Sequence, residues 1–328
     1  MNHPPLNGEL IDLRAGDYEA RIATAGATLV YLRRQGRDLV IPFDAEESLP
    51  GAWQGKTLAP WPNRIAGSCY TYRGVDYLVP CNEPETGAAL HGLVGWTNFA
   101  VGSGSGPDDG AAAGSASASA VVLTLGLPAS YAYPWALEVT VRYELDARTG
   151  LTVTTTATNA GAAVSRSVGV VGAPVEDGAP APAPYGVSCH PYLTRSVPLD
   201  ECSLQVPARR ILDVDSRMAP AGERDVTGTE CDWRAGRLVG ATATDNAYTG
   251  LPEGEWQVRL TGGEGERSVV MSAAVPWVQV YSGEHLGRSG VAVEPMTCPP
   301  NAFNTGQDLI TLAVGQSHSF TWRLWEED

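Results

Sequence analysis

The sequence predicts an all-β fold, a large antiparallel β-sandwich with few or no helices. Short runs of alternating apolar residues recur along the chain, and turns rich in glycine and proline separate them (37 Gly and 24 Pro in 328 residues). No segment of ten or more residues keeps apolar positions at the 3.6-residue spacing of an amphipathic helix between caps. Many short strands joined by frequent turns are typical of a sandwich.

The composition favours one domain over residues 1–328. Apolar residues make up 43% of the chain, which is enough for a sizeable core, and charged residues only 18%. Two stretches, near 102–120 (Gly/Ser/Ala-rich) and 172–184 (Pro-rich), are expected to be flexible insertions. Neither separates halves of different composition, so we do not expect a domain boundary at either.

The charge of the chain excludes some partners. A formal charge of −15 and a pI near 4.7 disfavour nucleic acid and anionic membrane surfaces, which both attract basic proteins. No apolar run approaches the ~18 residues that a membrane helix requires. A neutral small molecule suits this chain better as a ligand, and either a monomer or a homodimer fits the sequence.

The cysteines indicate neither a zinc site nor a disulfide framework. The six of them form no C-x-x-C pair, and no Cys/His spacing is typical of zinc. We therefore expect reduced thiols, no metal, and a cytoplasmic protein, since the N-terminal residues also lack a basic region followed by an apolar one.

Strands are expected in order along the chain. The first two are 18–23 and 28–32, with Gly26 in the turn between them, and a hairpin joins 69–72 to 75–79. The strongest hairpin pairs 135–145 with 151–158, because both runs alternate regularly around a turn at 146–150. Further strands are expected at 121–125, 202–206, 256–260, 268–273, 277–281, 291–293 and 318–325.

The segment 51–67 is an expected loop with a functional composition. Two prolines within three residues, Pro60 and Pro62, exclude a helix interior or a central strand. The loop nevertheless carries Trp53, Asn63 and Arg64, which suggests order over a binding site rather than free motion.

Three residues suggest acid–base chemistry. His91, His190 and Glu294 each end an apolar run beside Gly or Pro, and imidazoles and carboxylates are common general acids and bases. A carboxylate between Val293 and Pro295 is costly to bury without a partner. From the residues alone, each histidine is more often a structural residue, Arg64 could simply neutralise an acid, and Asp245 could form an Asx turn.

Five motifs, in order, decide between these alternatives, because together they resemble the aldose 1-epimerase family of galactose mutarotase-like proteins. The similarity runs from about residue 10 to residue 325. The motifs are Asn63-Arg64-Ile65 with Gly67 and the Tyr70/Tyr72 hairpin, Leu90-His91-Gly92, His190-Pro191-Tyr192-Leu193, Asp245 in Thr244-Asp245-Asn246-Ala247-Tyr248, and Glu294-Pro295-Met296 before Pro300-Asn301-Ala302-Phe303. The form that the first of these motifs takes here, over residues 56–65, is similar to that of a bacterial subgroup, some members of which resemble sulfoquinovose mutarotase.

The resemblance implies roles for these residues and no cofactor. Glu294 matches the base that removes the proton of the sugar C1 hydroxyl, and His190 matches the acid that protonates the ring oxygen. The matching sugar-binding residues are Arg64, His91, Asp245 and Asn63, with Tyr192 and Trp277 as packing or stacking groups. The implied function is that of a mutarotase acting on a free aldohexose or a close derivative.

The mechanism also predicts a geometry. The base and the acid serve two oxygens on one carbon, so we expect Glu294 and His190 to face each other across a cleft, roughly 5–8 Å apart, with the sugar ring between them.

Three alternatives remain open at this stage. A sugar-binding or sensing module would keep the sandwich without needing the acid–base pair. A hexose-6-phosphate mutarotase would require clustered cations, for which only Arg64 and Lys56 are available. A glycosidase would use two carboxylates, Asp245 and Glu294, but would leave both histidines unexplained.

Two features of the loops are also undecided. Lys56 either contacts an anionic substituent of the sugar or is a solvated loop lysine. The segment 172–184 either covers the site or is only a tolerated insertion.

Overall fold

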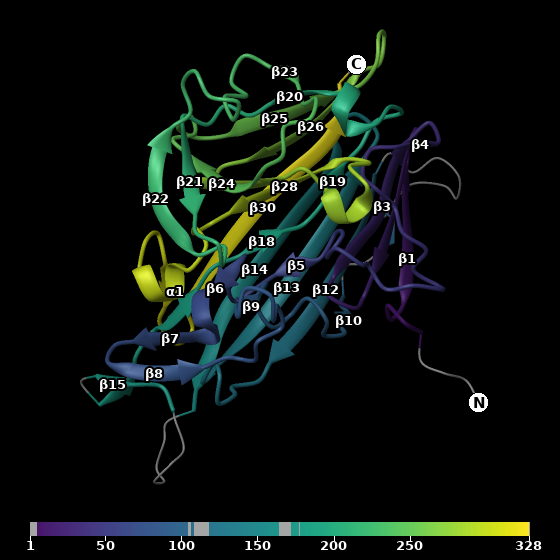
Figure 1. The fold of residues 1–328 in the computed structure, drawn as a ribbon. Coiled ribbons are helices and arrows are strands. Elements are labelled where there is room, and N and C mark those ends of the chain that lie inside the picture. The colour runs from purple at the N-terminus through teal and green to yellow at the C-terminus, as the bar shows by residue number, and fades with distance from the viewer. Residues whose placement is uncertain (1–4, 104–105, 108–117, 164–171, 177, 328) are drawn as a thin grey trace.

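The computed structural model describes residues 5–103, 106–107, 118–163, 172–176 and 178–327, and it is almost entirely β (Figure 1). Within these residues the helices are one short α-helix, α1 (Ala302–Thr305), and three 3₁₀ turns, η1 (Ala66–Ser68), η2 (Leu199–Glu201) and η3 (Glu284–Leu286). None of the described helices has the length and apolar character that a membrane span requires. The predicted fold class, an antiparallel β protein with few helices, is confirmed.

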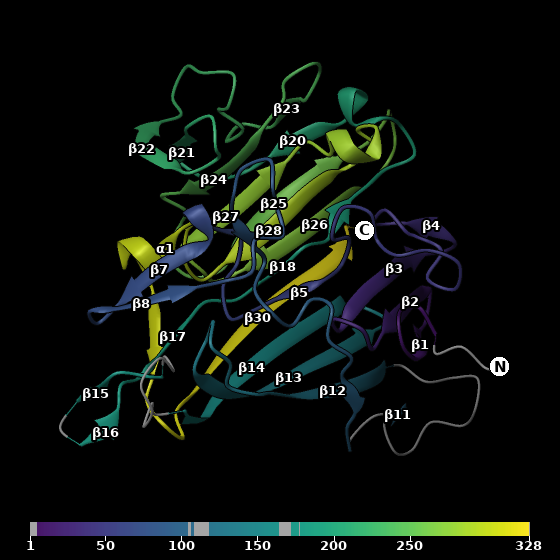
Figure 2. The ribbon, with the colours of Figure 1, turned by 60° about the horizontal axis from the view of Figure 1, so that its bottom comes forward.

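A ten-stranded sheet forms one layer of the sandwich, and β30, β14 and β13 cross the middle of the molecule (Figures 1 and 2). The strands along it are β10 (Ala100–Val101), β12 (Ala118–Leu127), β13 (Trp135–Asp146), β14 (Gly150–Ala162), β30 (Ser317–Glu326), β26 (Ser268–Ala273), β25 (Trp256–Thr261), β20 (Ser203–Gln205) and β23 (Arg237–Leu238), with β11 (Gly106–Pro107) beside β12. The predicted hairpin is β13–β14.

A six-stranded sheet forms the second layer and carries most of the site. Its order is β19 (Tyr192–Leu193), β28 (Val291–Met296), β27 (Trp277–Tyr281), β24 (Asp245–Thr249), β21 (Arg210–Val214) and β22 (Pro220–Asp225).

The remaining strands form smaller sheets around these two. The four N-terminal strands are β1 (Leu10–Ala15), β2 (Tyr18–Ala23), β3 (Thr28–Arg34) and β4 (Arg37–Asp38). The two-stranded pairs are β5 (Thr57–Leu58) with β18 (Ser188–Cys189), β6 (Arg64–Ile65) with β9 (Ala89–Leu90), β7 (Cys69–Tyr72) with β8 (Val75–Leu78), β15 (Val175–Glu176) with β16 (Ala179–Pro180), and β17 (Ala183–Tyr185) with β29 (Ile310–Leu312).

Alternation along the strands explains the core. Every second residue of β13 is buried, starting at Trp135, because strand side chains point alternately to opposite faces. These side chains join one apolar cluster that runs from Leu13 to Leu324 and includes Val278, Val280, Val291 and Val293 of the six-stranded sheet. The core therefore lies between the two large sheets.

Strand β28 is buried on both faces, and this positions the site. Val291 and Val293 belong to the main core, whereas Ala292 and Met296 belong to separate apolar clusters. By alternation Glu294 shares its face with Ala292 and Met296. The carboxylate thus stands on the face of the sheet that turns away from the main core.

The described part of 172–184 is held in place by aromatic hydrogen bonds, unlike the loose insertion that the sequence predicted. Its carbonyl oxygens accept hydrogen bonds from Tyr77, Trp135, Tyr72 and Tyr133 at 2.8–3.0 Å. The other predicted insertion, 102–120, falls mostly outside the described residues, and β12 already begins at Ala118.

A buried ionic cluster joins the last strand to distant parts of the chain. Both side-chain nitrogens of the Arg195 fork lie 3.1 Å from Oε1 of Glu326, and Arg37 Nη2 lies 3.1 Å from its Oε2. Arg195 also contacts Glu266 Oε1 at 2.6 Å. The Glu326 side chain is fully buried, so these ion pairs are the means by which its charge is accommodated.

Candidate active site

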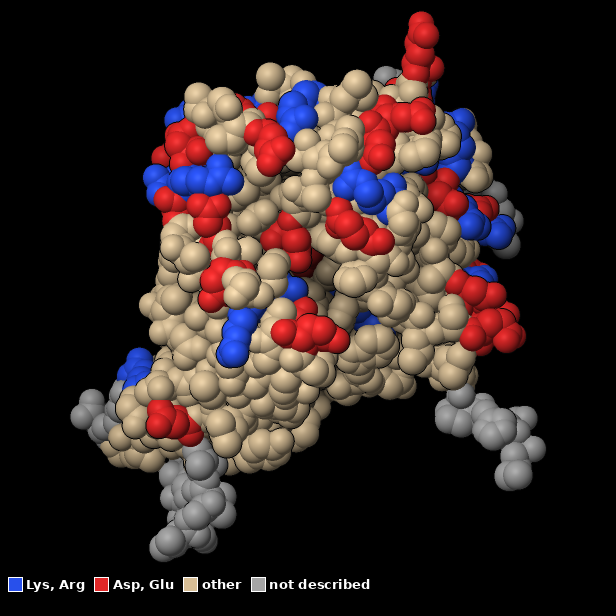
Figure 3. All heavy atoms as spheres, viewed as in Figure 1, with Lys and Arg blue, Asp and Glu red and all other residues tan. Residues whose placement is uncertain are grey.

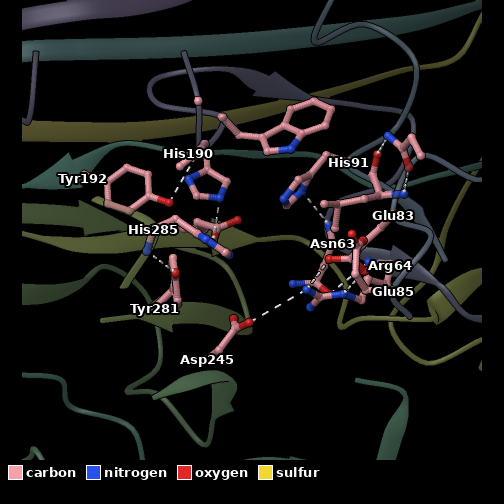
Figure 4. Close-up of a pocket in the computed structure, with 16 residues that line it drawn as sticks. Asn63, Arg64, Glu83, Glu85, His91, His190, Tyr192, Asp245, Tyr281 and His285 are labelled. Atoms are coloured by element: carbon pink, nitrogen blue, oxygen red, sulfur yellow. Dashed lines mark hydrogen bonds and ion pairs between the residues drawn. The ribbon is translucent and has the colours of Figure 1, made fainter. Parts of the chain in front are cut away.

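A cavity of about 570 Å³ opens between the six-stranded sheet and the N-terminal loops. The space-filling view shows a hollow near the centre of this face, with Asp and Glu side chains around it (Figure 3). The lining comes from widely separated parts of the sequence: loop 51–53, strand pair β6–β9, the segment around Glu83, and strands β24, β27 and β28 (Figure 4).

One wall of the cavity is built by strand register. Asp245 pairs with Tyr281, Tyr281 with Ala292, and Ala292 with Tyr192, so these four residues form one row on one face of the sheet. Gln279 and Glu294 form the adjacent row on the same face. Asp245 therefore begins a strand, β24, and is not merely the residue of an Asx turn.

Within that wall, the side chains of His190 and Glu294 meet. His190 Nε2 lies 3.4 Å from Glu294 Oε1, and the two residues are only 5% and 2% exposed. The main chain of the 51–57 loop holds the histidine, because His190 N donates to Lys56 O at 3.0 Å and Gly55 N donates to His190 O at 2.8 Å.

The expected separation of 5–8 Å between this pair was wrong. The expectation placed the sugar ring between the two groups. The two oxygens that they serve lie only roughly 2.3 Å apart on one carbon, so an acid and a base that approach from the same side require a similarly small spacing. The observed pair fits a sugar ring that packs against both side chains from one side, and not a ring that lies between them.

Burial shifts both groups of the pair toward their uncharged forms. Desolvation lowers the pKa of His190 to about 3 and raises the pKa of Glu294 well above its usual value, with the Asp245 charge adding to the second shift and Arg64 opposing it. Both shifts favour a neutral pair, in which the carboxylic acid holds the one proton that the two groups share. Moving that proton between the partners creates an ion pair without changing the net charge of the site.

His91 is fixed as a neutral hydrogen-bond donor. Its Nδ1 accepts a hydrogen bond from the main-chain N–H of Asn63 at 3.2 Å, so the neutral ring carries its proton on Nε2. Burial, and then the neighbouring His190, lowers its pKa well below the usual value. Its ring contacts His190 edge-on at 5.1 Å.

Backbone strain places His91 and Asn63. His91 has φ of 63°, Asn63 has φ of 52°, and Gly92 has φ of 73°, a left-handed region that non-glycine residues seldom adopt. A Cβ at Gly92 would lie 2.1 Å from the carbonyl oxygen of Ala59, so only glycine fits there.

Arg64 faces the cavity with a fixed carboxylate partner. Its Nε and Nη2 donate to the two oxygens of Glu83, each at 2.7 Å, and Nη2 lies 3.8 Å from Asp245 Oδ2 (Figure 4). Asp245 Oδ1 accepts a hydrogen bond from Gln279 Nε2 at 2.7 Å. These contacts set the direction of both charged groups before any ligand arrives.

Tyr192 lines the cavity, and Trp277 does not. The Tyr192 ring stacks on His190 at 5.1 Å, and its hydroxyl donates to Ala52 O at 3.1 Å. Trp277 lies one row further along the same face of the sheet, in an apolar cluster with Met296, and its Nε1 donates to Asp308 Oδ2 at 2.8 Å. Of the two roles expected for Trp277, packing or stacking, its buried ring therefore has the packing role, and a contact with the sugar stays a prediction.

The structure thus brings seven of the eight expected residues to one cavity. They are Asn63, Arg64, His91, His190, Tyr192, Asp245 and Glu294. Three further lining residues, Glu83, Tyr281 and His285, were not predicted, because they lie in irregular segments or alternate with ordinary strand residues. Trp53 was expected only as one aromatic residue of an ordered loop.

The same residues raise the question of a metal. Ligand atoms of His91, His190 and Glu294 lie within 4.8 Å of one another, and two histidines with a glutamate form one of the known zinc donor sets. However, His91 Nδ1 already accepts the Asn63 N–H, and its Nε2 carries the proton. The donor chemistry of this cluster therefore suits hydrogen bonding to a sugar better than coordination of a metal.

The fold is that of the galactose mutarotase-like proteins. The galactose 1-epimerase of Lactobacillus acidophilus NCFM superposes with a TM-score of 0.79 at 19% identity, covering 100% of this chain and 98% of that one. A galactose mutarotase-like protein of Clostridium acetobutylicum gives 0.79 at 18% identity, covering 97% and 95%.

The chain belongs to the aldose 1-epimerase family. The sequence model of that family, described as Aldose 1-epimerase, matches residues 9–170 and 174–325. The chain is also 38% identical over 320 residues to the uncharacterized protein YihR of Escherichia coli K12, covering 97% of this chain and 94% of that one. The predicted enzyme class, an isomerase of the mutarotase type, is confirmed, whereas the closer similarity to sulfoquinovose mutarotase stays a prediction.

Proposed function

We propose that this protein interconverts the α and β anomers of a free, uncharged aldohexose, or a close uncharged derivative, by opening and reclosing the sugar ring. The observation that carries the proposal is the buried His190–Glu294 pair, 3.4 Å apart in the wall of the cavity. An acid and a base at this spacing match two oxygens bonded to one carbon.

In this mechanism Glu294 is the base and His190 is the acid. The reactive form has the shared proton on His190. Glu294 takes the proton of the C1 hydroxyl, the C1–O5 bond breaks as the C1 carbonyl forms, and His190 gives its proton to O5. Rotation about C1–C2 exposes the other carbonyl face, and the reverse transfers close the ring. A positioned pair contributes ~10²–10⁴-fold, and orientation adds more.

Charge is conserved within the pair throughout the reaction. Before ring opening the pair is Glu⁻ with His⁺, and afterwards it is a neutral acid with a neutral imidazole. The burial that shifts both pKa values favours the second form, which accompanies the open-chain sugar. The resting pair has this same neutral form, so burial stabilises the resting site and the intermediate alike, and the ion pair forms only when the shared proton moves from Glu294 to His190.

The charges of the cavity support a neutral sugar over a phosphorylated or sulfonated one. Four carboxylates line it, those of Glu83, Glu85, Asp245 and Glu294, against the one guanidinium of Arg64. That guanidinium already makes a bidentate pair with Glu83. Phosphate and sulfonate groups are usually bound by free Arg or Lys side chains, and the described lining supplies none.

Other groups of the cavity are suited to sugar hydroxyls. His91 offers an Nε2–H donor, Arg64 retains N–H groups that Glu83 does not use, and Asp245 offers a carboxylate acceptor. We further propose that the whole chain acts as one domain, which the shared core cluster from Leu13 to Leu324 supports.

The test is NMR exchange spectroscopy, or polarimetry, with pure anomers of glucose and galactose and with glucose 6-phosphate. We expect wild-type protein to accelerate mutarotation of at least one neutral sugar, and Glu294→Gln to lose most of the rate. Glu138→Gln, which changes an exposed glutamate on β13, is the matched control and should retain full activity. Sugar binding by calorimetry without acceleration would replace the mutarotase with the sugar-sensor alternative.

A further inference from the structure

Lys56 is the only lysine in the sequence, in a chain whose other basic residues are arginines and histidines. Its side chain is 0% exposed, which neither expectation for it foresaw. The ammonium donates to Ala25 O at 3.1 Å and lies 4.3 Å from the centre of the Trp96 ring. Within the described residues no carboxylate lies at ion-pair distance from it, so it is held by a carbonyl and an aromatic face.

A continuous series of ring contacts leads from this ammonium to the acid–base pair. Trp96 contacts Trp53 edge-on at 5.2 Å, Trp53 contacts His91 edge-on at 4.9 Å, and His91 contacts His190 at 5.1 Å. Trp53, His91 and His190 line the cavity. Lys56 also touches the site through its main chain, because its carbonyl oxygen accepts the His190 N–H.

The packing around this series leaves little freedom. A Cβ at Gly26 would lie 2.8 Å from Cδ of Lys56, and a Cβ at Gly95 would lie 2.8 Å from the Trp53 ring. Trp53 itself has φ of 60°, an unfavourable value for a bulky residue. Such a conformation persists only where neighbouring contacts impose it.

We propose that Lys56 is a positioning residue, whose ammonium holds Trp96 and, through it, Trp53 and His91 in the arrangement that receives the sugar. This inference rests on the proposed function for its kinetic readout. The contact depends on charge, because the aromatic face attracts a cation and not a neutral amine. A lysine, unlike an arginine, can lose that charge within the pH range of an assay.

Burial lowers the pKa of Lys56 to about 8, which makes the contact testable by pH. The titratable groups around the series are His91, His190, Tyr143 and Cys189. Burial lowers the pKa of both histidines and raises the pKa of the tyrosine and of the thiol. None of these four changes charge between pH 7 and 9. Burial also raises the pKa of Glu294, which contacts His190 and is present in wild type and Lys56→Met alike, so a transition that this variant lacks reports on Lys56.

The first measurement is KM and kcat for the neutral sugar from pH 6.5 to 9.5. Lys56→Met keeps the apolar stem and removes the charge. It should raise KM ~2- to 30-fold at pH 7, the range expected for one cation–π contact, while kcat changes less than about twofold. Wild-type KM should rise toward the variant value as pH passes about 8, and the variant should lack this transition.

The second measurement exploits the single lysine. Protein labelled with ¹⁵Nζ-lysine gives one side-chain signal, so the Lys56 titration can be followed directly. Because coupling between two binding events is reciprocal, a ~2- to 30-fold effect of protonation on sugar affinity requires saturating sugar to raise the Lys56 midpoint by about 0.3–1.5 pH units. This readout requires sugar binding but no catalysis.

Two further variants guard against a folding artefact. Trp96 is half exposed, so Trp96→Leu should fold, and it should reproduce the KM increase and the loss of pH dependence. Trp96→Phe keeps an aromatic face, so its KM should lie closer to that of wild type and should keep part of the pH dependence. Lys56→Met in the Trp96→Leu background should add little.

The outcomes separate this inference from the proposed function. A Lys56 midpoint unchanged by sugar, together with a Lys56→Met KM within twofold of wild type, would overturn the positioning role even if mutarotation is fast. Absence of mutarotation with a sugar-dependent midpoint would instead overturn the enzyme proposal and keep the positioning role.

Discussion

Glu294→Gln should abolish most of the activity while leaving the protein equally or more stable. Glutamine has nearly the same shape as glutamate, so the slot beside His190 on β28 stays filled. The amide cannot accept the C1 hydroxyl proton, and we expect kcat to fall ~10²–10⁴-fold. The 3.4 Å contact to His190 remains available to the amide oxygen, which keeps the ring in place.

The stability change has a sign that follows from burial. The pKa of Glu294 is raised in the folded protein above its unfolded value of 4.5, so the folded state binds more protons above that pH. Wild-type protein therefore loses stability as pH rises through the window above 4.5 up to the raised value. Glutamine does not titrate, so the variant should gain in Tm relative to wild type between pH 5 and pH 7, and match it near pH 4.

Two assays test this prediction. Exchange spectroscopy at equal anomer concentrations gives kcat, and thermal unfolding from pH 4 to pH 7 gives the relative Tm. A variant with more than about a tenth of wild-type kcat would rule out Glu294 as the general base. A variant whose Tm falls relative to wild type as pH rises would show that the carboxylate is stabilised in the ionised form, contrary to the buried environment described.

Three other changes test the cavity and the fold. Glu83→Gln releases the Arg64 guanidinium and removes one negative charge from the cavity. The ratio of kcat/KM for glucose 6-phosphate to kcat/KM for glucose should therefore rise on the order of tenfold. This is the effect of a unit charge ~10 Å away at an effective dielectric of 20. Glu326→Ala leaves buried arginines without their carboxylate, and should cost about 3–5 kcal/mol of unfolding free energy in urea titrations. Gly92→Ala should displace His91 and raise KM, because the added Cβ meets the Ala59 carbonyl at 2.1 Å.

Each of these changes has a matched control. Glu85→Gln removes the same charge from the cavity lining without freeing Arg64. If this variant raised the relative kcat/KM for glucose 6-phosphate as much as Glu83→Gln, the release of Arg64 from Glu83 would not contribute to the change. Asp213→Asn breaks an exposed ion pair and should cost no more than about 1 kcal/mol. Gly74 also has a positive φ, 78°, but a Cβ added there would have no atom within 4 Å. If Gly74→Ala raised KM as much as Gly92→Ala, the steric argument for Gly92 would be contradicted.

Much of the fold follows from local alternation, and the failures have physical causes. The β13–β14 hairpin was predictable because one face packs on the core and the other is polar, so that burial alternates along the strand. Strands β21 and β22 were missed because β22 is mostly exposed and carries no apolar alternation. Nothing in a one-dimensional pattern distinguishes such a strand from a polar loop.

Most residues of the site could be predicted from the sequence, whereas the distances between them could not. Motif order identified His190 and Glu294, whose approach depends on the β5–β18 and β19–β28 pairings between segments far apart in sequence. Glu83 could not be foreseen, because its role comes from a single contact with Arg64. Lys56 was misjudged because a charged side chain in a loop is ordinarily solvated, and only the fold shows the aromatic face above it.

The position of β30 has a consequence for how the chain reaches this structure. The last strand of the sequence lies in the interior of the ten-stranded sheet, between β14 and β26. Until residues 317–326 leave the ribosome, β14 and β26 each present an unpaired edge, and such edges readily pair with other chains. The sheet that supports the cavity therefore closes only after β30 has been synthesised, and removal of these ten residues would leave two half-sheets in place of one.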